Sequence, residues 1–264
     1  MNKVALITGA SSGIGRALAH EFASHGFSLI LVSKNEDHLM AAAADIRNRH
    51  GAFGVDTVTI VKDLTKPNAC RELYDEVKKL NLDVDVLVND AGVAKRGNFV
   101  DLPLEDVIEI PVLNTIALTI LTRLFLEDMK ARNHGCILNL GSIAGFQPGP
   151  LLAVYHASKA YVNSFTEALA EELKDTGITV TCLCPGPTDT HFFERAEMED
   201  ANVVKSGLLM DPAEVARAAY EGLSNRERIV IPGAMNKVLT FTRRLIPIEL
   251  QAKINKKFYE ESEE

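Results

Sequence analysis

The sequence is poor in cysteine, and four cysteines among 264 residues are too few for a disulfide scaffold. Cys182 and Cys184 lie two residues apart in the apolar run 178–184, which places both on one face of a predicted strand. Because no second Cys or His pair follows at the spacing of metal ligands, we predict buried thiols and no metal site. This usage indicates a reducing compartment and therefore a cytoplasmic protein.

Basic charge is also scarce, since 28 Lys and Arg face 36 Asp and Glu for a net charge of −8. This balance disfavours a general nucleic-acid binder and attachment to anionic lipid by charge alone. No apolar run reaches the roughly 20 residues of a membrane-spanning helix without a charge or a proline. The apolar run after Lys3 is short and ends in a glycine turn, so we expect no signal peptide and no integral membrane segment.

The remaining composition, 47% hydrophobic and 24% charged, is that of a globular protein. Short apolar runs alternate with segments of helical period. This alternation predicts an α/β fold, a doubly wound parallel sheet of about seven strands with six or more helices on both faces. The runs are 4–8, 28–33, 55–61, 84–89, 136–141, 178–184 and 228–231, and the helical stripes are Ile14/Leu18/Phe22, Leu73/Val77/Leu80, Val112/Ile116/Ile120/Leu124 and Val162/Phe165/Leu169.

The alternation covers residues 1–232, which we interpret as one dinucleotide-binding and catalytic domain. Residues 233–264 form a C-terminal helical extension, with helices expected over 234–246 and 248–262 and a break at Pro247. The chain then ends in the acidic run 260–264, which we expect to fray into solvent.

The first predicted strand leads directly into the sequence TGASSGIG at 8–15 and then into a helix. Glycines at these spacings let the backbone turn sharply and approach a diphosphate, while the helix N-terminus supplies amide donors. A plain glycine-rich turn is the alternative, and a triphosphatase loop is disfavoured because no Gly-Lys-Ser/Thr follows. The loop residues expected to bind cofactor are Gly9, Ser11, Ser12, Gly13, Ile14 and Gly15.

Four further motifs follow in order: NDAG at 89–92, Ser142, YHASK at 155–159 and PG at 185–186. The ordered set resembles the short-chain dehydrogenase/reductase family, from residue 3 to about 232. The resemblance implies a Rossmann fold, a nicotinamide dinucleotide and hydride transfer between a carbonyl and an alcohol. Beyond the loop, it implies cofactor contacts from Asp63, Leu64, Asn89, Ala91, Gly92, Tyr155, Lys159, Pro185, Gly186, Thr188 and Thr190.

One position departs from the family motif Asn-Asn-Ala-Gly, because Asp90 stands where the second asparagine is expected. An aspartate cannot donate a hydrogen bond as asparagine does, so a local hydrogen bond must differ. We do not take this change as a loss of function, since Asn89 and Gly92 remain.

Tyr155 and Lys159 have i, i+4 spacing, which puts both side chains on one helix face. A phenol titrates near 10, and a nearby ammonium is expected to lower that pKa enough for acid–base work. The resemblance implies that Lys159 also binds the nicotinamide ribose, that Ser142 holds the substrate oxygen and that the Asn114 backbone holds a water. Each residue alone would be an ordinary surface residue. A serine hydrolase is disfavoured, because 141–145 lacks the Gly-x-Ser-x-Gly spacing.

The second predicted strand ends at Ser33-Lys34, where an acid would grip a ribose 2′-hydroxyl and specify NAD. A hydroxyl and a cation fit a 2′-phosphate instead, and Arg16 could add a second cation. We therefore predict NADP as cofactor, with NADPH favoured over NADH. A solvated loop lysine is the alternative for Lys34.

The segment 191–210 is expected to form a mobile helical lid, with Phe192, Phe193 and Met198 facing Phe146 and Pro148 across an apolar substrate pocket. The alternative is that these side chains only pack the lid on the domain. His156 is interpreted as structural and His191 as a surface residue.

The predicted function is an oxidoreductase for an apolar small-molecule carbonyl or alcohol (3-oxoacyl, steroid-like or a simple ketone or aldehyde), working as a homodimer or homotetramer. One alternative is a non-catalytic, redox-sensing dinucleotide-binding module. Another is a membrane-surface helix, against which a core or dimer contact is favoured; its residues are Val238, Leu239, Phe241, Arg243, Arg244 and Leu245.

Overall fold

The structure is a computed structural model that describes residues 3–51, 54–205, 207 and 209–262. Seven parallel strands in this part of the chain form one sheet in the order β3-β2-β1-β4-β5-β6-β7. The order reverses between β1 and β4, as in a doubly wound sheet. The strands are β1 Val4–Thr8, β2 Ser28–Ser33, β3 Thr57–Val61, β4 Val86–Asn89, β5 Gly135–Leu140, β6 Ile178–Leu183 and β7 Ile229–Val230. The predicted fold class is confirmed; β1 and β2 have the predicted bounds, and the bounds of the other five strands differ by one or two residues.

The central strands are apolar throughout because both faces of the sheet are covered. β1 is buried at all five positions, and alternate side chains feed two separate cores. Ala5 and Ile7 pack on one side, whereas Val4 and Leu6 pack on the other. A period of two residues therefore decides which layer each side chain joins.

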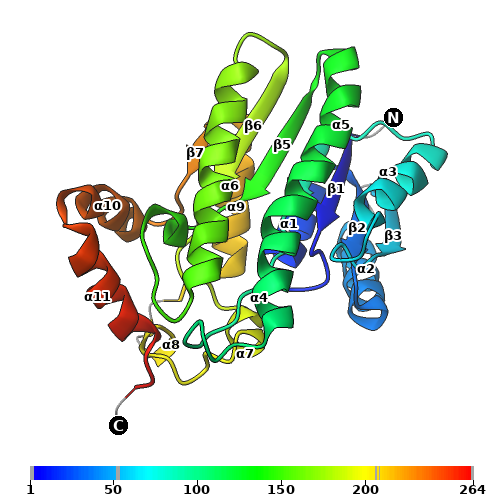
Figure 1. Ribbon diagram of the computed structural model, residues 1–264. Coiled ribbons are helices and arrows are strands. Elements are labelled where there is room, and N and C mark those ends of the chain that lie inside the picture. The colour runs from blue at the N-terminus through cyan, green and yellow to red at the C-terminus, as the bar shows by residue number, and fades with distance from the viewer. Residues whose placement is uncertain (1–2, 52–53, 206, 208, 263–264) are drawn as a thin grey trace.

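Figure 1 shows the resulting three layers. The core that contains Ala5 is covered by α1 (Gly13–Ser24), α2 (Glu36–His50) and α9 (Pro212–Ser224). The core that contains Leu6 is covered by α3 (Ala69–Lys79), α5 (Leu118–Arg132) and α6 (Ala153–Glu172). The loops after the carboxyl ends of the strands run toward the short helices α7 (Phe192–Arg195) and α8 (Asn202–Lys205), and this edge holds the site.

One helical run is long and apolar enough to cross a membrane by length and composition alone. It spans 104–132, contains an 18-residue window with a mean hydropathy of 1.6, and consists of α4 (Leu104–Pro111), a π-helical turn (Val112–Ala117) and α5. The predicted helix is confirmed, but its apolar stripe at Ile116 and Ile120 is 51% and 41% exposed. The core face is instead formed by Leu113, Ala117, Leu121, Phe125 and Met129. This helix is apolar on more than one face, so its pattern did not reveal which face is buried.

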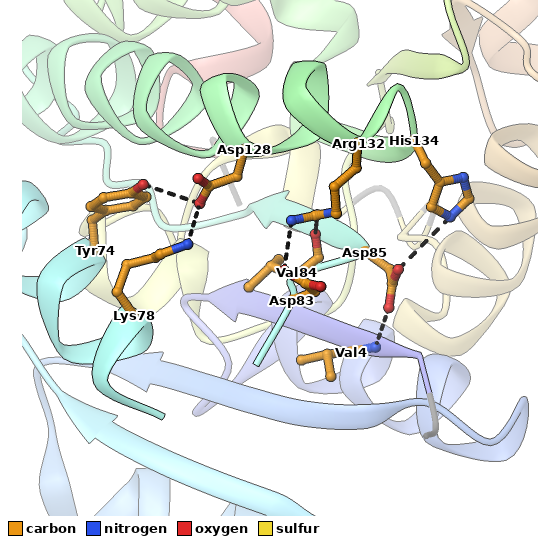
Figure 2. Close-up of polar contacts among 9 residues, drawn as sticks. All are labelled: Val4, Tyr74, Lys78, Asp83, Val84, Asp85, Asp128, Arg132 and His134. Atoms are coloured by element: carbon orange, nitrogen blue, oxygen red, sulfur yellow. Dashed lines mark hydrogen bonds and ion pairs between the residues drawn. The ribbon is translucent and has the colours of Figure 1, made fainter. Parts of the chain in front are cut away.

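A polar cluster closes the opposite, amino edge of the sheet (Figure 2). Arg132, at the end of α5, donates to the Asp83 carboxylate (2.8 Å) and to the Val84 carbonyl (2.9 Å). The Asp85 carboxylate accepts from the Val4 amide at 2.8 Å, which joins the β4 entry to β1. These bonds fix the positions of α5 and β4 relative to β1 at this edge. The segments that line the site follow β1 and β4 at the opposite edge of the sheet.

The chain ends in α10 (Ala234–Thr242), a 3₁₀ turn (Arg243–Leu245) and α11 (Ile248–Tyr259), with the predicted break at Pro247. Their buried side chains are polar: Thr240 on α10 and Asn255 on α11. Asn255 donates to the Pro148 carbonyl at 2.6 Å. α11 ends at Tyr259, three residues before the predicted end of the second helix. Residues 263–264 of the acidic run and residues 206 and 208 of the predicted lid lie outside the described residues.

Candidate active site

A cleft lies at the carboxyl ends of the strands, beside the point where the strand order reverses between β1 and β4. Its volume is about 1250 Å³, including space open to solvent. In a doubly wound sheet this is the place where ligands bind. Its walls come from the loop after β1, the segments after β4, β5 and β6, the first turns of α6, and the lid.

The loop after β1 has the backbone geometry expected of a diphosphate cradle. Gly9 and Gly13 adopt positive φ values of +70° and +56°, which side chains rarely tolerate. A Cβ on Gly15 would lie 2.6 Å from the Gly9 carbonyl oxygen, so only glycine allows this packing. The Thr8 hydroxyl accepts from the Asp90 and Ala91 amides at 3.0 and 3.1 Å and ties the loop to β4. The residues present therefore fit a dinucleotide.

Asp90 lies directly beneath this cradle. A Cβ on Gly9 would meet its Oδ2 at 2.7 Å, and its buried Oδ1 has no hydrogen-bond partner among the described residues. Burial raises the pKa of this carboxyl from 3.8 to about 7, against the opposing effects of the Lys159 ammonium and the Gly15 amide. Asp90 therefore lacks the N–H donor that asparagine would bring to this position. Near neutral pH, the O–H of the protonated Asp90 carboxyl can replace that donor.

Ser142 and Tyr155 converge in the cleft from the end of β5 and the first turn of α6. The Ser142 hydroxyl accepts from the Ala144 amide at 3.0 Å, which fixes its direction. Burial raises the pKa of Tyr155 to about 12, and its hydrogen bond with Ser142 opposes this rise. The expected lowering by Lys159 does not occur in this state, because the ammonium lies 5.8 Å from the ring centroid and donates elsewhere.

Lys159 is buried and donates from Nζ to the Leu140 carbonyl at 2.7 Å. Burial lowers its pKa from 10.5 to about 8, and the charge of Asp90 opposes this fall. Lys159 is thus a buried cation held at the base of the cleft between Asp90 and the Tyr155 ring. The predicted i, i+4 pairing places both α6 side chains in the same cleft.

Asn114 lies in the π-helical turn before α5 and is buried. Its side chain accepts from the Val93 amide and donates to the Val93 carbonyl, both at 2.9 Å, and it donates to Ser158 at 3.0 Å. The side chain thereby joins the segment after β4 to α6. π-Turns of this kind are frequent at functional sites.

A second cleft lies on the other side of the glycine loop and brings Ser11, Ser33 and Lys34 together. The Ser11 and Ser33 hydroxyls are 2.8 Å apart. The sequence shows no acid at this strand end, but the fold brings Glu109 of α4 to 3.3 Å from the Lys34 ammonium. Arg16, expected as the second cation, instead pairs with Asp45 of α2 at 2.7 Å. In this structure α2 therefore holds the Arg16 guanidinium, and its contact with a 2′-phosphate stays a prediction.

The other expected cofactor residues divide into two groups. Ser12, Gly13, Ile14, Ala91, Gly92, Pro185, Gly186, Thr188 and Thr190 line the main cleft together with Gly9. Asn89 instead donates to Thr122 (3.0 Å) and Asn139 (2.9 Å) below the cleft floor. Asp63 accepts from Thr65 after β3, and Leu64 packs in the core, so neither lines either of these two clefts.

The lid supplies apolar wall as expected, since Phe192, Phe193 and Met198 line the cleft. The Phe192 ring lies 5.3 Å from the Tyr155 ring, centroid to centroid, at an interplanar angle of 51°. Phe146 and Pro148 were expected opposite the lid, but Gln147, Leu152 and Tyr259 take that place. Phe146 packs on α6 instead, because the short 3₁₀ helix after Ser142 turns it toward Val162.

Two further residues gave no sequence signal. Asn163 donates to the Ser142 carbonyl (3.1 Å) and accepts from its amide (3.4 Å), so it positions the serine from α6. Arg195 of the lid donates to the Ser12 hydroxyl at 3.1 Å and borders both clefts. Their partners lie 21 and 183 residues away in sequence, which no local pattern reveals.

The two histidines near the site differ in role. His156 bonds to the Gln147 carbonyl (2.8 Å) and to the Tyr259 hydroxyl (3.0 Å), so it joins the site loop to α11 as a structural residue. Burial lowers its pKa, which keeps the ring neutral at physiological pH. His191 is exposed and pairs with Glu194 at 3.1 Å.

Cys182 and Cys184 are buried side by side with sulfurs 3.5 Å apart, and all four cysteines are free thiols. Across the described residues, no group of three or more His, Cys, Asp or Glu side chains is arranged to hold a metal ion.

A family model described as short chain dehydrogenase matches residues 3–201. A very-long-chain 3-oxoacyl-CoA reductase of Phaeosphaeria nodorum is 37% identical over 242 residues, which cover 90% of this chain and 67% of that protein. One of Bos taurus is 35% identical over 187 residues, 69% of this chain and 58% of that protein. The chain thus spans about three fifths of the length of these relatives.

Among solved structures, a short-chain dehydrogenase from Sphingobium yanoikuyae in complex with NADPH is similar, with a TM-score of 0.81 and 33% identity over 92% of this chain and 94% of that one. A short-chain dehydrogenase/reductase from Burkholderia phymatum in complex with NAD has a TM-score of 0.83 and 27% identity, covering 95% of both chains. Proteins of this architecture therefore bind either nicotinamide dinucleotide.

Proposed function

The chain belongs to the short-chain dehydrogenase/reductase family, and from this premise we propose that it is an NAD(P)-dependent oxidoreductase acting on a carbonyl or alcohol. The observation that carries the proposal is the convergence of Ser142, Tyr155 and Lys159 in one cleft beside the glycine cradle. The three side chains come from two elements, β5 and α6, so chance placement on a surface does not explain their meeting.

The bound cofactor supplies the hydride and, when oxidised, a positive charge in the cleft. In the reduction direction, the Ser142 hydroxyl donates to the substrate oxygen while negative charge develops there. The Tyr155 hydroxyl gives its proton to that oxygen, and with a pKa of about 12 it holds that proton throughout the neutral range. We assign Lys159, whose Nζ lies 5.8 Å from the Tyr155 ring centroid, to the ribose hydroxyls of the cofactor.

We further propose an apolar substrate of the 3-oxoacyl type. Support comes from the apolar wall formed by Leu152, Phe192, Phe193, Met198 and Val203, and from the names of the relatives described above. The test is a panel of 3-oxoacyl thioesters, hydroxysteroids and simple ketones followed at the nicotinamide absorbance. Wild type should turn over at least one class, and Tyr155→Phe should turn over none.

A non-catalytic, redox-sensing module is the competing function. Such a module needs the glycine cradle but not a serine, a tyrosine and a lysine directed into a second, apolar half of the cleft. Binding of cofactor with no turnover across the whole panel would favour it over the enzyme.

We propose NADPH as the preferred cofactor, with Ser33 and Lys34 at the 2′-phosphate. Lys34 is exposed and already faces Glu109, so its contribution is that of a screened surface charge, about threefold to tenfold in kcat/KM. Lys34→Ala should lower the NADPH/NADH ratio, whereas Glu109→Gln should raise it by freeing the ammonium. An unchanged ratio in both variants would contradict this assignment.

We also propose a cytoplasmic homo-oligomer built on the exposed α4–α5 face. Ile108, Ile116 and Ile120 are more than 40% exposed, and Arg123 and Glu127 lie beside them as a pair. A two-fold contact would bury the isoleucines and set each Arg123 against the partner's Glu127. Light scattering should show a dimer that Ile116→Glu converts to monomer, or a tetramer that it converts to dimer. The free thiols suit a reducing cytoplasm.

A further inference from the structure

The two C-terminal helices have an inverted polarity pattern. Their buried residues are Thr240 and Asn255, whereas their large apolar side chains face outward. The exposed set is Met235, Val238, Leu239, Phe241, Leu245, Ile248, Leu250, Ile254 and Phe258, which we call the tail face. Folding of the monomer cannot account for this arrangement, because it leaves the apolar surface in water.

The tail face follows helical spacing on both helices. Leu250, Ile254 and Phe258 repeat every four residues along α11, and Met235, Val238 and Phe241 repeat every three along α10. Each helix therefore presents one continuous apolar stripe. Figure 1 shows α10 and α11 at one side of the molecule, away from the α3–β3 edge.

Charge in this segment opposes that of the chain. Residues 234–259 contain six Lys or Arg and one Glu, a net charge of +5 in a chain whose total is −8. Lys237, Lys253 and Lys257 are exposed beside the apolar stripes. Of the acids that follow, Glu260 pairs with Lys256 of α11 at 3.6 Å, and Glu261 lies 3.9 Å from Arg96.

The tail also reaches the substrate cleft. Tyr259, the last residue of α11, lines the cleft and bonds to His156, and Asn255 binds the loop at Pro148. A surface that covers the tail face would therefore lie near the cleft's apolar half.

We propose that the tail face is a docking surface for an anionic lipid bilayer, on which α10 and α11 lie in the interfacial plane. An apolar stripe bordered by lysines is the pattern that binds such an interface. Each basic residue near an anionic surface strengthens binding by about fivefold. A second copy of this chain fits less well, because a two-fold contact would bring the exposed Lys237, Lys253 and Lys257 of both copies together. The proposal stands independently of the reaction catalysed.

The test is co-sedimentation with vesicles of phosphatidylcholine alone or mixed with phosphatidylglycerol, at low and high salt. Wild type should bind the anionic vesicles at least about tenfold more tightly than the neutral ones, and salt should weaken binding. Phe241→Glu should lose most of the binding. Phe99→Glu is its matched control, because Phe99 is 61% exposed against 67% for Phe241 and lies in a loop far from the tail in sequence. It should bind like wild type.

A second pair of variants tests the contribution of the basic residues beside the tail face. Lys253→Glu should weaken binding to anionic vesicles, whereas Lys79→Glu, exposed at the end of α3, should not. Reductase activity on a water-soluble substrate and circular dichroism confirm that each variant is folded. Absence of wild-type binding, or equal binding by Phe241→Glu and Phe99→Glu, would overturn the proposal. So would a change in oligomeric mass on Phe241→Glu with lipid binding unchanged, since the tail face would then be a contact between copies.

Discussion

Replacing Asp90 with Asn should stabilise the protein, and it should do so only above acidic pH. Asn has the shape of the protonated carboxyl and cannot ionise. The folded pKa of about 7 lies above the ordinary 3.8, so the folded state holds a proton that the unfolded state has released. Wild-type stability therefore falls as pH rises from about 4 to about 7, and this loss is complete above pH 7.

The size of the effect follows from that difference. At 1.36 kcal/mol per pH unit, the rise from 3.8 to about 7 costs the wild type roughly 4 kcal/mol at neutral pH. Asp90 is 9% exposed at the cleft wall, and water that enters the cleft reduces this cost, so we expect about 2–4 kcal/mol. For a chain of this size, each kcal/mol shifts Tm by about 2 °C.

The assay is urea unfolding of wild type and Asp90→Asn at pH 4.5 and pH 7.5, without cofactor. The free energies of unfolding should differ by no more than about 1 kcal/mol at the lower pH, and by the larger amount at the higher one. Asp75→Asn, at an exposed position on α3, controls for the loss of one charge. A stability difference that is the same at both pH values, or a destabilised Asp90→Asn at pH 7.5, would refute the reasoning.

Three further outcomes test other parts of the structure. Tyr155→Phe should retain cofactor affinity, measured by fluorescence titration, and lose about a thousandfold or more in kcat, because only the proton donor is removed. Arg195→Ala should weaken cofactor binding about threefold to tenfold, with a smaller salt dependence than wild type, because it lies at the Ser12 end of the cradle; equal affinities at low salt would count against this. Arg132→Ala should lower the free energy of unfolding by about 1–3 kcal/mol and leave kcat/KM unchanged, because its bonds to Asp83 and the Val84 carbonyl lie at the far edge of the sheet.

The local sequence was enough to predict a structural feature when all of its residues lie in one loop, helix or strand. The Gly9–Gly15 loop is readable because the positive φ angles of Gly9 and Gly13 arise within the loop itself. Tyr155 and Lys159 are readable because helical spacing alone places them on one face. The parallel sheet was predictable for the same reason, since strands covered on both faces are apolar throughout. The ordered motifs then indicated the family.

Contacts between segments that are distant in the sequence could not be predicted from local patterns. Glu109 faces Lys34 across 75 residues, Arg16 turns to Asp45, and Arg195 reaches Ser12 from the lid. The exposed face of the 104–132 helix could not be predicted either, because the sequence of a helix that is apolar on several faces does not indicate which face the sheet will cover. The sequence by itself therefore determined the fold class and the shared helix face of Tyr155 and Lys159, whose geometry is local. Only the tertiary structure decided the charges around the cofactor, the titration of Asp90 and the exposure of the tail face, because burial and electrostatic fields depend on which distant side chains the packing brings together.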